Sequence, residues 1–231
     1  MPSFPRKGLG RDIAFILSFL GLTLTEQVRR NLPPAMKRAL DVAVSSLALL
    51  LLSPLFLVVA IAIKISDPGP VFFWQDRVGL FGCTFAFPKF RSMVVDAEAL
   101  KQRLLRHNQH ADGVTFKMKD DPRITSIGRI IRRFSIDELP QFWSVLRGDM
   151  SVVGPRPAVP REVALYSVRD RVRLQAKPGL TCIWQVSGRA DLAFVKQVQL
   201  DEEYILRRSF WFDLRLIFQT IPAVLHGKGA Y

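Results

Sequence analysis

The sequence predicts a helix-dominated α+β fold that is attached to a membrane by one inserted helix. Residues 42–63 form an apolar run without a charged side chain, and about 20 such residues suffice for a helix to cross the hydrocarbon core of a bilayer. Two short β-like runs follow, and several segments with helical spacing come after them. The chain of 231 residues fits one domain of ordinary size, and no break in composition marks a second.

The inserted helix, at about residues 41–64, carries a break signal near its centre. Pro54 follows Ser53, and a proline inside a helix removes one backbone N–H and bends the helix. The Ser53 hydroxyl can then cover the carbonyl that the proline leaves free. Basic residues flank the run on both sides, which favours the cytoplasm for both ends: Arg29, Arg30, Lys37 and Arg38 before it, and Lys64, Arg77, Lys89 and Arg91 after it. A re-entrant helix that returns to the face it entered explains both observations, and a kinked span is the alternative.

Other elements are predicted on both sides of this helix. Residues 1–36 are interpreted as a leader and residues 37–231 as the main domain; the apolar stretch 13–24 is too short to cross and favours an interfacial helix. Strands are expected at 71–75 and 83–93, the second on an edge because it contains Pro88. Helical spacing marks residues 93–107, 127–133, 192–208 and 210–225. The last of these is rich in aromatic residues, and both an interfacial position and core packing fit it.

The charge balance indicates anionic partners. The formal net charge is +13 and the isoelectric point is about 10.4, which suits nucleic acid, an anionic membrane surface or a phosphorylated substrate. The long uncharged run argues against a nucleic-acid binder. Cys83 and Cys182 provide neither a disulfide framework nor a zinc site, which indicates a reducing compartment. No glycine-rich phosphate-binding loop is present, so phosphate groups must be bound by side chains.

Two adjacent carboxylates, Asp137 and Glu138, stand out in this basic chain. Ser135 and Glu138 have the spacing of a capping box, but with Ser135 at the N-cap Pro140 would fall at the fifth helical position and lose a hydrogen bond. Asp137 is therefore the better N-cap, since Pro140 then lies in the first turn. Either arrangement puts both carboxylates at a helix N-terminus, where the dipole favours the ionised form. An ionised carboxylate suits a helix cap, a nucleophile or a Mg²⁺ ligand.

Cations gather in the sequence around this acidic pair. Arg156 lies in "GPRP", where prolines stiffen the backbone around a guanidinium that can grip phosphate oxygens. Six further basic residues precede the pair: Lys117, Lys119, Arg123, Arg129, Arg132 and Arg133. The acids are then either plain charge balance or a nucleophile and a metal ligand inside a phosphate-binding pocket. A basic pocket beside a re-entrant helix favours a substrate that is both phosphorylated and lipidic.

The chain resembles a known family in a series of ordered blocks. These run "KRALD", "SPLF", "DPGPVFF", "QDRVG", "PKFRSM", "DDPRIT", "SIDELPQFW", "VLRGDMSVVGPRP", "PGLTCIWQVSGR" and "DEEY". With them the chain is similar to the bacterial sugar transferases, the monotopic polyprenyl-phosphate phosphoglycosyl transferases, over roughly residues 37–227. Little precedes that region, so it looks like the minimal catalytic form of the family.

The resemblance implies an activity and a location. Such enzymes transfer a sugar 1-phosphate from a UDP-sugar to a polyprenyl (undecaprenyl) phosphate, release UMP and initiate exopolysaccharide or other surface-glycan synthesis. It implies a compact catalytic domain on the cytoplasmic face of the bacterial inner membrane, a re-entrant helix broken at Ser53–Pro54, and no nucleic-acid partner. A homo-oligomer is left open. A non-catalytic scaffold of a glycan-assembly complex is the alternative, against which the intact acidic pair and Arg156 argue.

The resemblance also implies roles for residues. Asp137 matches the nucleophile that forms a covalent aspartyl-phosphosugar, and Glu138 matches the ligand of a Mg²⁺ cofactor. Lys89, Arg132 and Arg156 match positions that bind phosphate or steady the site. Five other residues lie in matching motifs with looser roles in substrate binding: Arg91, Arg123, Gln141, Asp149 and Arg189. One departure is Ser144, where the family usually has asparagine; we expect it to tune the activity, since a hydroxyl still donates and accepts.

Overall fold

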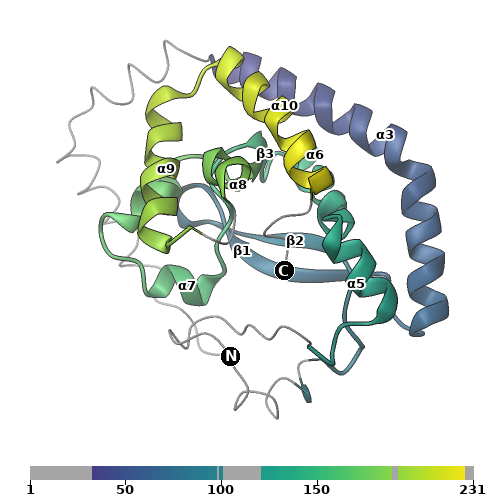
Figure 1. The fold of residues 1–231 in the computed structure, drawn as a ribbon. Coiled ribbons are helices and arrows are strands. Elements are labelled where there is room, and N and C mark those ends of the chain that lie inside the picture. Colours follow the sequence, from purple (N-terminus) through teal and green to yellow (C-terminus); the bar gives the residue numbers. More distant parts are fainter. Residues whose placement is uncertain (1–32, 98, 101–120, 189–191, 227–231) are drawn as a thin grey trace.

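The computed structural model describes residues 33–97, 99–100, 121–188 and 192–226, which form a long bent helix against a domain of short elements (Figure 1). Some predictions lie outside these residues: the interfacial helix at 13–24, most of the helix at 93–107, and Arg189. The described part is helix-dominated with two small sheets, so the predicted α+β class is confirmed at that level.

The long helix is α3 (Pro34–Ser66), and among the described residues it alone is long and apolar enough to cross a membrane. It bends part-way along its length (Figure 1), and Pro54 lies inside it. The Ser53 hydroxyl donates to the carbonyl of Leu50 at 2.8 Å. That carbonyl is the one which Pro54, lacking an N–H, leaves without its helical donor. The predicted covering of the freed carbonyl is thus confirmed.

Both ends of α3 pack on the same domain, while its middle is uncovered. Near its start, Asp41 and Ser45 are buried, and near its end Val59 and Ile63 are buried. Between and beside them lie exposed apolar side chains: Leu47, Leu50, Leu51, Leu57, Val58 and Ile61. An apolar surface of this kind, flanked by two docked ends, is what a helix embedded in lipid presents.

A β-hairpin carries the first part of the domain. Strands β1 (Phe72–Val78) and β2 (Thr84–Phe90) pair antiparallel, with Phe73 opposite Lys89. The turn between them, η1 (Leu80–Gly82), contains Phe81 at φ 54°. The sheet has only two strands, so Pro88 lies on an edge strand as predicted. Residues Phe90 and Ile131 then pack against the buried end of α3.

A second, parallel pair was not predicted from the sequence. Strands β3 (Ser151–Val153) and β4 (Gly179–Thr181) each have three residues and pair in parallel, which is too short for periodicity to reveal. Gly154, directly after β3, lies so close to its neighbour that a Cβ there would stand 2.3 Å from the carbonyl oxygen of Lys177. Glycine at this position lets the segment that carries "GPRP" lie against β4.

The helices follow the sequence pattern except where they are short. Helices α5 (Ser126–Arg133), α9 (Phe194–Arg207) and α10 (Phe210–His226) confirm the predicted segments. Four shorter elements join them: α6 (Phe142–Arg147), α7 (Pro160–Ala164), η4 (Asp170–Gln175) and α8 (Ile183–Ser187). Helix α10 contributes Leu216 to the core and leaves Trp211 exposed, so the core packing left open for this segment is confirmed for one of its faces.

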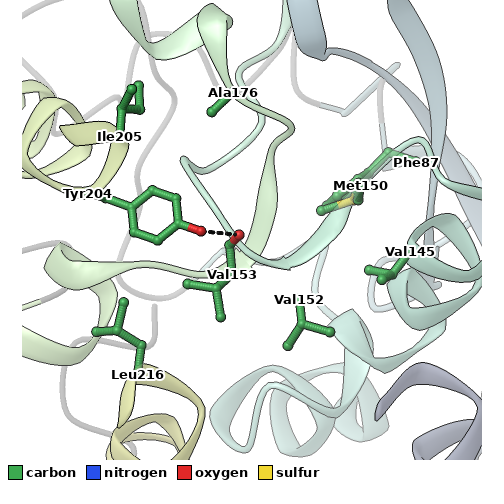
Figure 2. Close-up of a cluster of buried hydrophobic side chains, with 9 residues drawn as sticks. All are labelled: Phe87, Val145, Met150, Val152, Val153, Ala176, Tyr204, Ile205 and Leu216. Carbon is green, nitrogen blue, oxygen red and sulfur yellow. Dashed lines mark hydrogen bonds between the residues drawn. The ribbon is translucent and has the colours of Figure 1, made fainter. Parts of the chain in front are cut away.

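The main core joins β2, α6, β3, α9 and α10. Figure 2 shows its buried side chains, which are Phe87, Val145, Met150, Val152, Val153, Ala176, Tyr204, Ile205 and Leu216. Because this core ties β3 and α6 to the long C-terminal helices, the two loops that flank these elements are held in fixed positions. The segment before α6 carries Asp137 and Glu138, and the loop after β3 carries Arg156.

Candidate active site

The acidic pair lies in η3 (Ile136–Gln141), a 3₁₀ helix that runs directly into α6. Ser135 occupies the N-cap position in a left-handed conformation at φ 55°, and its side chain makes no capping hydrogen bond. The prediction of Asp137 as N-cap is therefore wrong, and the capping box considered for Ser135 is not formed either. Asp137 is the second residue of the helix, and Pro140 is its fifth, just before the junction with α6.

Glu138 is the centre of a charged cluster. It accepts a hydrogen bond from Lys89 Nζ at 2.7 Å and lies 3.7 Å from Arg156 Nη2, with 27% of its side chain exposed. Burial opposes ionisation, but Lys89 and then Arg156 outweigh it and lower the pKa of Glu138 to about 2. Glu138 is thus an anion that faces solvent in part and has two cations beside it.

Asp137 has a different environment from its neighbour. Its side chain is buried, and burial raises its pKa to about 6, although Lys89 acts in the opposite direction. Ionised Glu138 beside it adds to the increase. The sequence predicted that a helix dipole would favour the ionised form of both carboxylates; a six-residue 3₁₀ helix has too weak a dipole to outweigh burial. The pKa of Asp137 therefore lies above its ordinary value, and that of Glu138 lies below its own.

Three predicted cations converge on this pair from separate elements. Lys89 comes from β2 and lies 5.6 Å from the centre of the Phe87 ring. Arg156 comes from the loop after β3, with 38% of its side chain exposed. Arg132 comes from α5, and its charge lowers the pKa of both Asp137 and Asp121. The structure thus brings together residues that are far apart in the sequence around one pair of acids.

Other predicted site residues are bound elsewhere. Arg91 is buried, donates to the carbonyl of Asp67 and lies 3.6 Å from the Asp67 carboxylate, so it fastens the hairpin to the end of α3. Arg123 is buried in an ion pair with Asp121 at 2.6 Å. Asp149 lies 3.3 Å from exposed Arg147. A role in phosphate binding stays a prediction for Arg91 and Arg123, and the role of Asp149 also stays open.

Two buried polar residues line the first turn after the acidic pair. Gln141 is 3% exposed, and its Nε2 has no hydrogen-bond partner among the described residues. Ser144, in place of the family's usual asparagine, is buried, and its carbonyl accepts hydrogen bonds from the backbone N–H groups of Gly148 and Asp149. A buried amide donor without a partner is costly unless a ligand or water meets it.

Arg77 is a site residue that the sequence reasoning did not single out. Its guanidinium donates to the carbonyl of Pro157 at 3.0 Å and lies 5.1 Å from the centre of the Phe87 ring. Burial, and then nearby Arg156, lower its pKa to about 10. The block "QDRVG" contained it, but nothing local indicated that it would reach residues 80 positions away. It fixes the backbone that follows Arg156.

The described residues contain no group of three or more histidine, cysteine, aspartate or glutamate side chains that would hold a metal unaided. In phosphate sites, Mg²⁺ is commonly bound by one or two carboxylates, and substrate phosphates and water complete its coordination. Glu138, ionised and partly exposed, is a carboxylate of the required kind.

Comparisons with known proteins agree with this chemistry. The bacterial sugar transferase family matches residues 32–227. The exopolysaccharide production protein ExoY of Sinorhizobium fredii is 42% identical over 198 residues, which are 84% of this chain and 88% of that protein. The galactosyl transferase CpsE of Streptococcus agalactiae is 49% identical over 197 residues, which are 84% of this chain and 43% of that protein.

A third relative is the UDP-glucose:undecaprenyl-phosphate glucose-1-phosphate transferase of Caulobacter vibrioides. It is 39% identical over 203 residues, which are 84% of this chain and 72% of that protein. An apolar helix docked on a domain with a cation-rich acidic pair is compatible with a membrane-associated enzyme that acts on phosphorylated groups. The chain belongs to the bacterial sugar transferase family and is a phosphoglycosyl transferase.

Proposed function

We propose that this protein transfers a hexose 1-phosphate from a UDP-hexose to undecaprenyl phosphate and releases UMP, the first membrane step in the synthesis of an exopolysaccharide or related glycan. The observation that carries the proposal is the convergence of Lys89, Arg132 and Arg156 on the Asp137–Glu138 pair. The hexose follows from the relatives, one of which is named a galactosyl transferase and another a glucose-1-phosphate transferase.

Asp137 acts as the nucleophile in this scheme. Its carboxylate oxygen attacks the sugar-side phosphorus of the UDP-hexose, and the bond from that phosphorus to the bridging oxygen breaks, so that UMP leaves with the bonding electrons. An oxygen of undecaprenyl phosphate then attacks the same phosphorus and displaces the Asp137 carboxylate. No general base is needed in either step, because the carboxylate and the phosphate are already anions.

The neighbouring residues stabilise the charge that moves between these groups. Glu138 would hold Mg²⁺, which supplies neutralisation of the diphosphate charge when it is bound. Lys89 and Arg156, which share Glu138 in the free protein, are placed to bind phosphoryl oxygens once the diphosphate enters. Arg77 keeps the Arg156 loop in place through its bond to Pro157.

In this proposal, the helix α3 holds the catalytic domain at the membrane surface. Since the residues near its start contact α6 and β3, and the residues near its end contact Phe90 and Ile131, one domain holds both ends. Such a domain has to lie on one side of the bilayer, which supports a re-entrant helix rather than a span. The basic flanks favour the cytoplasmic side of the inner membrane, where the acidic pair can meet a lipid-linked phosphate.

The proposal is tested by assaying UMP release in nanodiscs that contain undecaprenyl phosphate and Mg²⁺. The donors are UDP-glucose, UDP-galactose and their N-acetylated counterparts, and Asp137→Asn is the matched control, since asparagine has nearly the same size but is not a nucleophile. We expect UMP from a UDP-hexose with the wild-type protein alone. A folded wild-type protein that releases no UMP from any donor would refute the proposed function.

A further inference from the structure

Three side-chain donor groups lie within hydrogen-bond distance of the carbonyl oxygen of Val153, the last residue of β3. They are Lys37 Nζ from α3 at 3.1 Å, Tyr204 OH from α9 at 2.9 Å and Ser151 Oγ at 3.0 Å. Each hydroxyl has a single proton, which it shares between this carbonyl and a buried carboxylate: Asp213 at 3.0 Å for Tyr204 and Asp41 at 2.9 Å for Ser151. Figure 2 shows the Tyr204 hydroxyl pointing at this carbonyl inside the core. This carbonyl therefore belongs to one connected polar network that surrounds the end of β3.

Two buried carboxylates organise these donors. Asp213 of α10 is fully buried; it pairs with Lys37 Nζ at 2.6 Å and lies 3.0 Å from Tyr204 OH. Asp41 of α3 accepts from the backbone N–H of Val152 at 2.9 Å and lies 3.6 Å from Lys37. We call Lys37, Asp41, Tyr204 and Asp213 the β3 clamp.

The segment held by the β3 clamp leads directly to Arg156. Gly154 N–H donates to the carbonyl of Thr181 at 2.9 Å, and the carbonyl of Pro155 accepts from Gly179 at 2.8 Å. The next carbonyl but one, that of Pro157, accepts from Arg77. The backbone is therefore fixed before and after Arg156, while the Arg156 side chain remains partly exposed beside Glu138.

Burying an ion pair generally gives little net stability, because the desolvation of the charges offsets their attraction. Apolar residues of similar size would join α3, α9 and α10 at least as well. What a buried polar network adds is a single defined geometry for the groups it bonds, here the end of β3. That geometry directly fixes the start of the loop after β3, which carries Arg156.

We propose that Lys37, Tyr204 and Asp213 are positioning residues which hold Arg156 in register with Glu138 and the donor diphosphate. This inference rests on the proposed function. Since Lys37 belongs to the membrane helix, it also makes the placement of Arg156 depend on correct seating of α3. Donor binding is thereby linked to membrane insertion. A guanidinium displaced by about 1 Å loses much of its effect on a transferring phosphoryl group.

The test is a double-mutant cycle between the β3 clamp and Arg156, measured as the kcat/KM for UMP release by the full chain in nanodiscs. Tyr204→Phe removes one hydroxyl and retains the ring, and we expect it to lower kcat/KM roughly tenfold, mainly through the KM for the UDP-hexose. Arg156→Lys lowers it as well. Because both act through the same guanidinium, the double variant should be no worse than Arg156→Lys alone.

The matched control is Leu216→Ala, which removes core packing from α10 and leaves every polar group of the β3 clamp intact. In the double variant, the fold-losses in kcat/KM from Leu216→Ala and Arg156→Lys should multiply, as they do for independent sites. The fold-loss from Leu216→Ala should be proportional to its decrease in the thermal midpoint of unfolding. If the fold-losses in kcat/KM from Tyr204→Phe and Arg156→Lys also multiply in the double variant, the β3 clamp is merely structural and the inference is wrong. Should Tyr204→Phe not fold, Lys37→Arg, which keeps the charge and moves the donors, enters the same cycle. A wild-type protein without UMP release refutes the proposed function instead.

Discussion

At the scale of single residues, the protein separates two adjacent carboxylates by their surroundings. Glu138 has Lys89 and Arg156 beside it and a pKa of about 2, whereas Asp137 is buried and has a pKa of about 6. A low pKa suits a residue that must remain an anion to bind a cation. A raised pKa makes a carboxylate a stronger nucleophile once it is ionised. In the proposed mechanism, the same dipeptide would provide both the nucleophile and the metal ligand.

The raised pKa of Asp137 predicts the acid limb of the pH profile. The nucleophile must be deprotonated, so kcat/KM for UMP release should fall as the pH drops through about 6. At lower pH, a plot of log(kcat/KM) against pH should approach a slope of one. The profile of kcat/KM reports the free enzyme, to which this pKa refers. Activity that stays constant well below pH 6 would mean that Asp137 is not the group that titrates, provided that thermal unfolding shows the protein intact there.

The position of Glu138 predicts metal dependence. Chelation should abolish UMP release and Mg²⁺ should restore it, since a phosphate site with one carboxylate ligand binds its metal reversibly. Glu138→Gln should lower kcat by about 100-fold or more, because a neutral amide is a poor ligand for a hard cation. Thermal unfolding of the variant serves as the control for folding. Full activity in excess chelator would exclude the assigned role of Glu138.

At the scale of elements, the bend of α3 and the docking of both its ends on one domain determine on which side of a membrane each end would lie. The hydrogen bond from Ser53 to the carbonyl of Leu50 could be predicted because it is local. The contacts from Arg77 to Pro157 and from Tyr204 to Val153 could not, since they join residues 80 and 51 positions apart. Pattern recognition also failed for the three-residue strands β3 and β4 and for the 3₁₀ helix at Asp137, since these elements are shorter than the windows over which periodicity can be recognised.

The bend predicts the same sidedness for both ends of α3. Single cysteines at Ala39 and Ser66, introduced after replacing exposed Cys83 by serine, should react with a membrane-impermeant maleimide only from the cytoplasmic side. Pro54→Leu restores the missing N–H and should straighten the helix. In that variant the two positions should become accessible from opposite sides. Opposite sidedness in the unaltered helix would refute re-entry.

At the scale of the whole molecule, one domain brings together the candidate site and a helix that is long and apolar enough to cross a membrane. The cations of the site come from β2, α5 and the loop after β3, and the core fixes these elements relative to α9 and α10. The family and the acidic pair could be predicted from short sequence blocks, because such blocks are contiguous. The β3 clamp could not, because it is assembled from α3, α9 and α10.

The central claim is that Asp137 becomes covalently phosphorylated by the donor, and the half-reaction tests it most directly. The full chain in nanodiscs without undecaprenyl phosphate is mixed with excess UDP-hexose and Mg²⁺, and UMP and the mass of the Asp137 peptide are measured together. We expect at most one UMP per protein and a hexose-phosphate increment on that peptide, both absent from Asp137→Asn. Asparagine at this position removes no N-cap, since Ser135 occupies the N-cap position. Normal turnover by Asp137→Asn, or UMP release only after acceptor is added, would contradict the account.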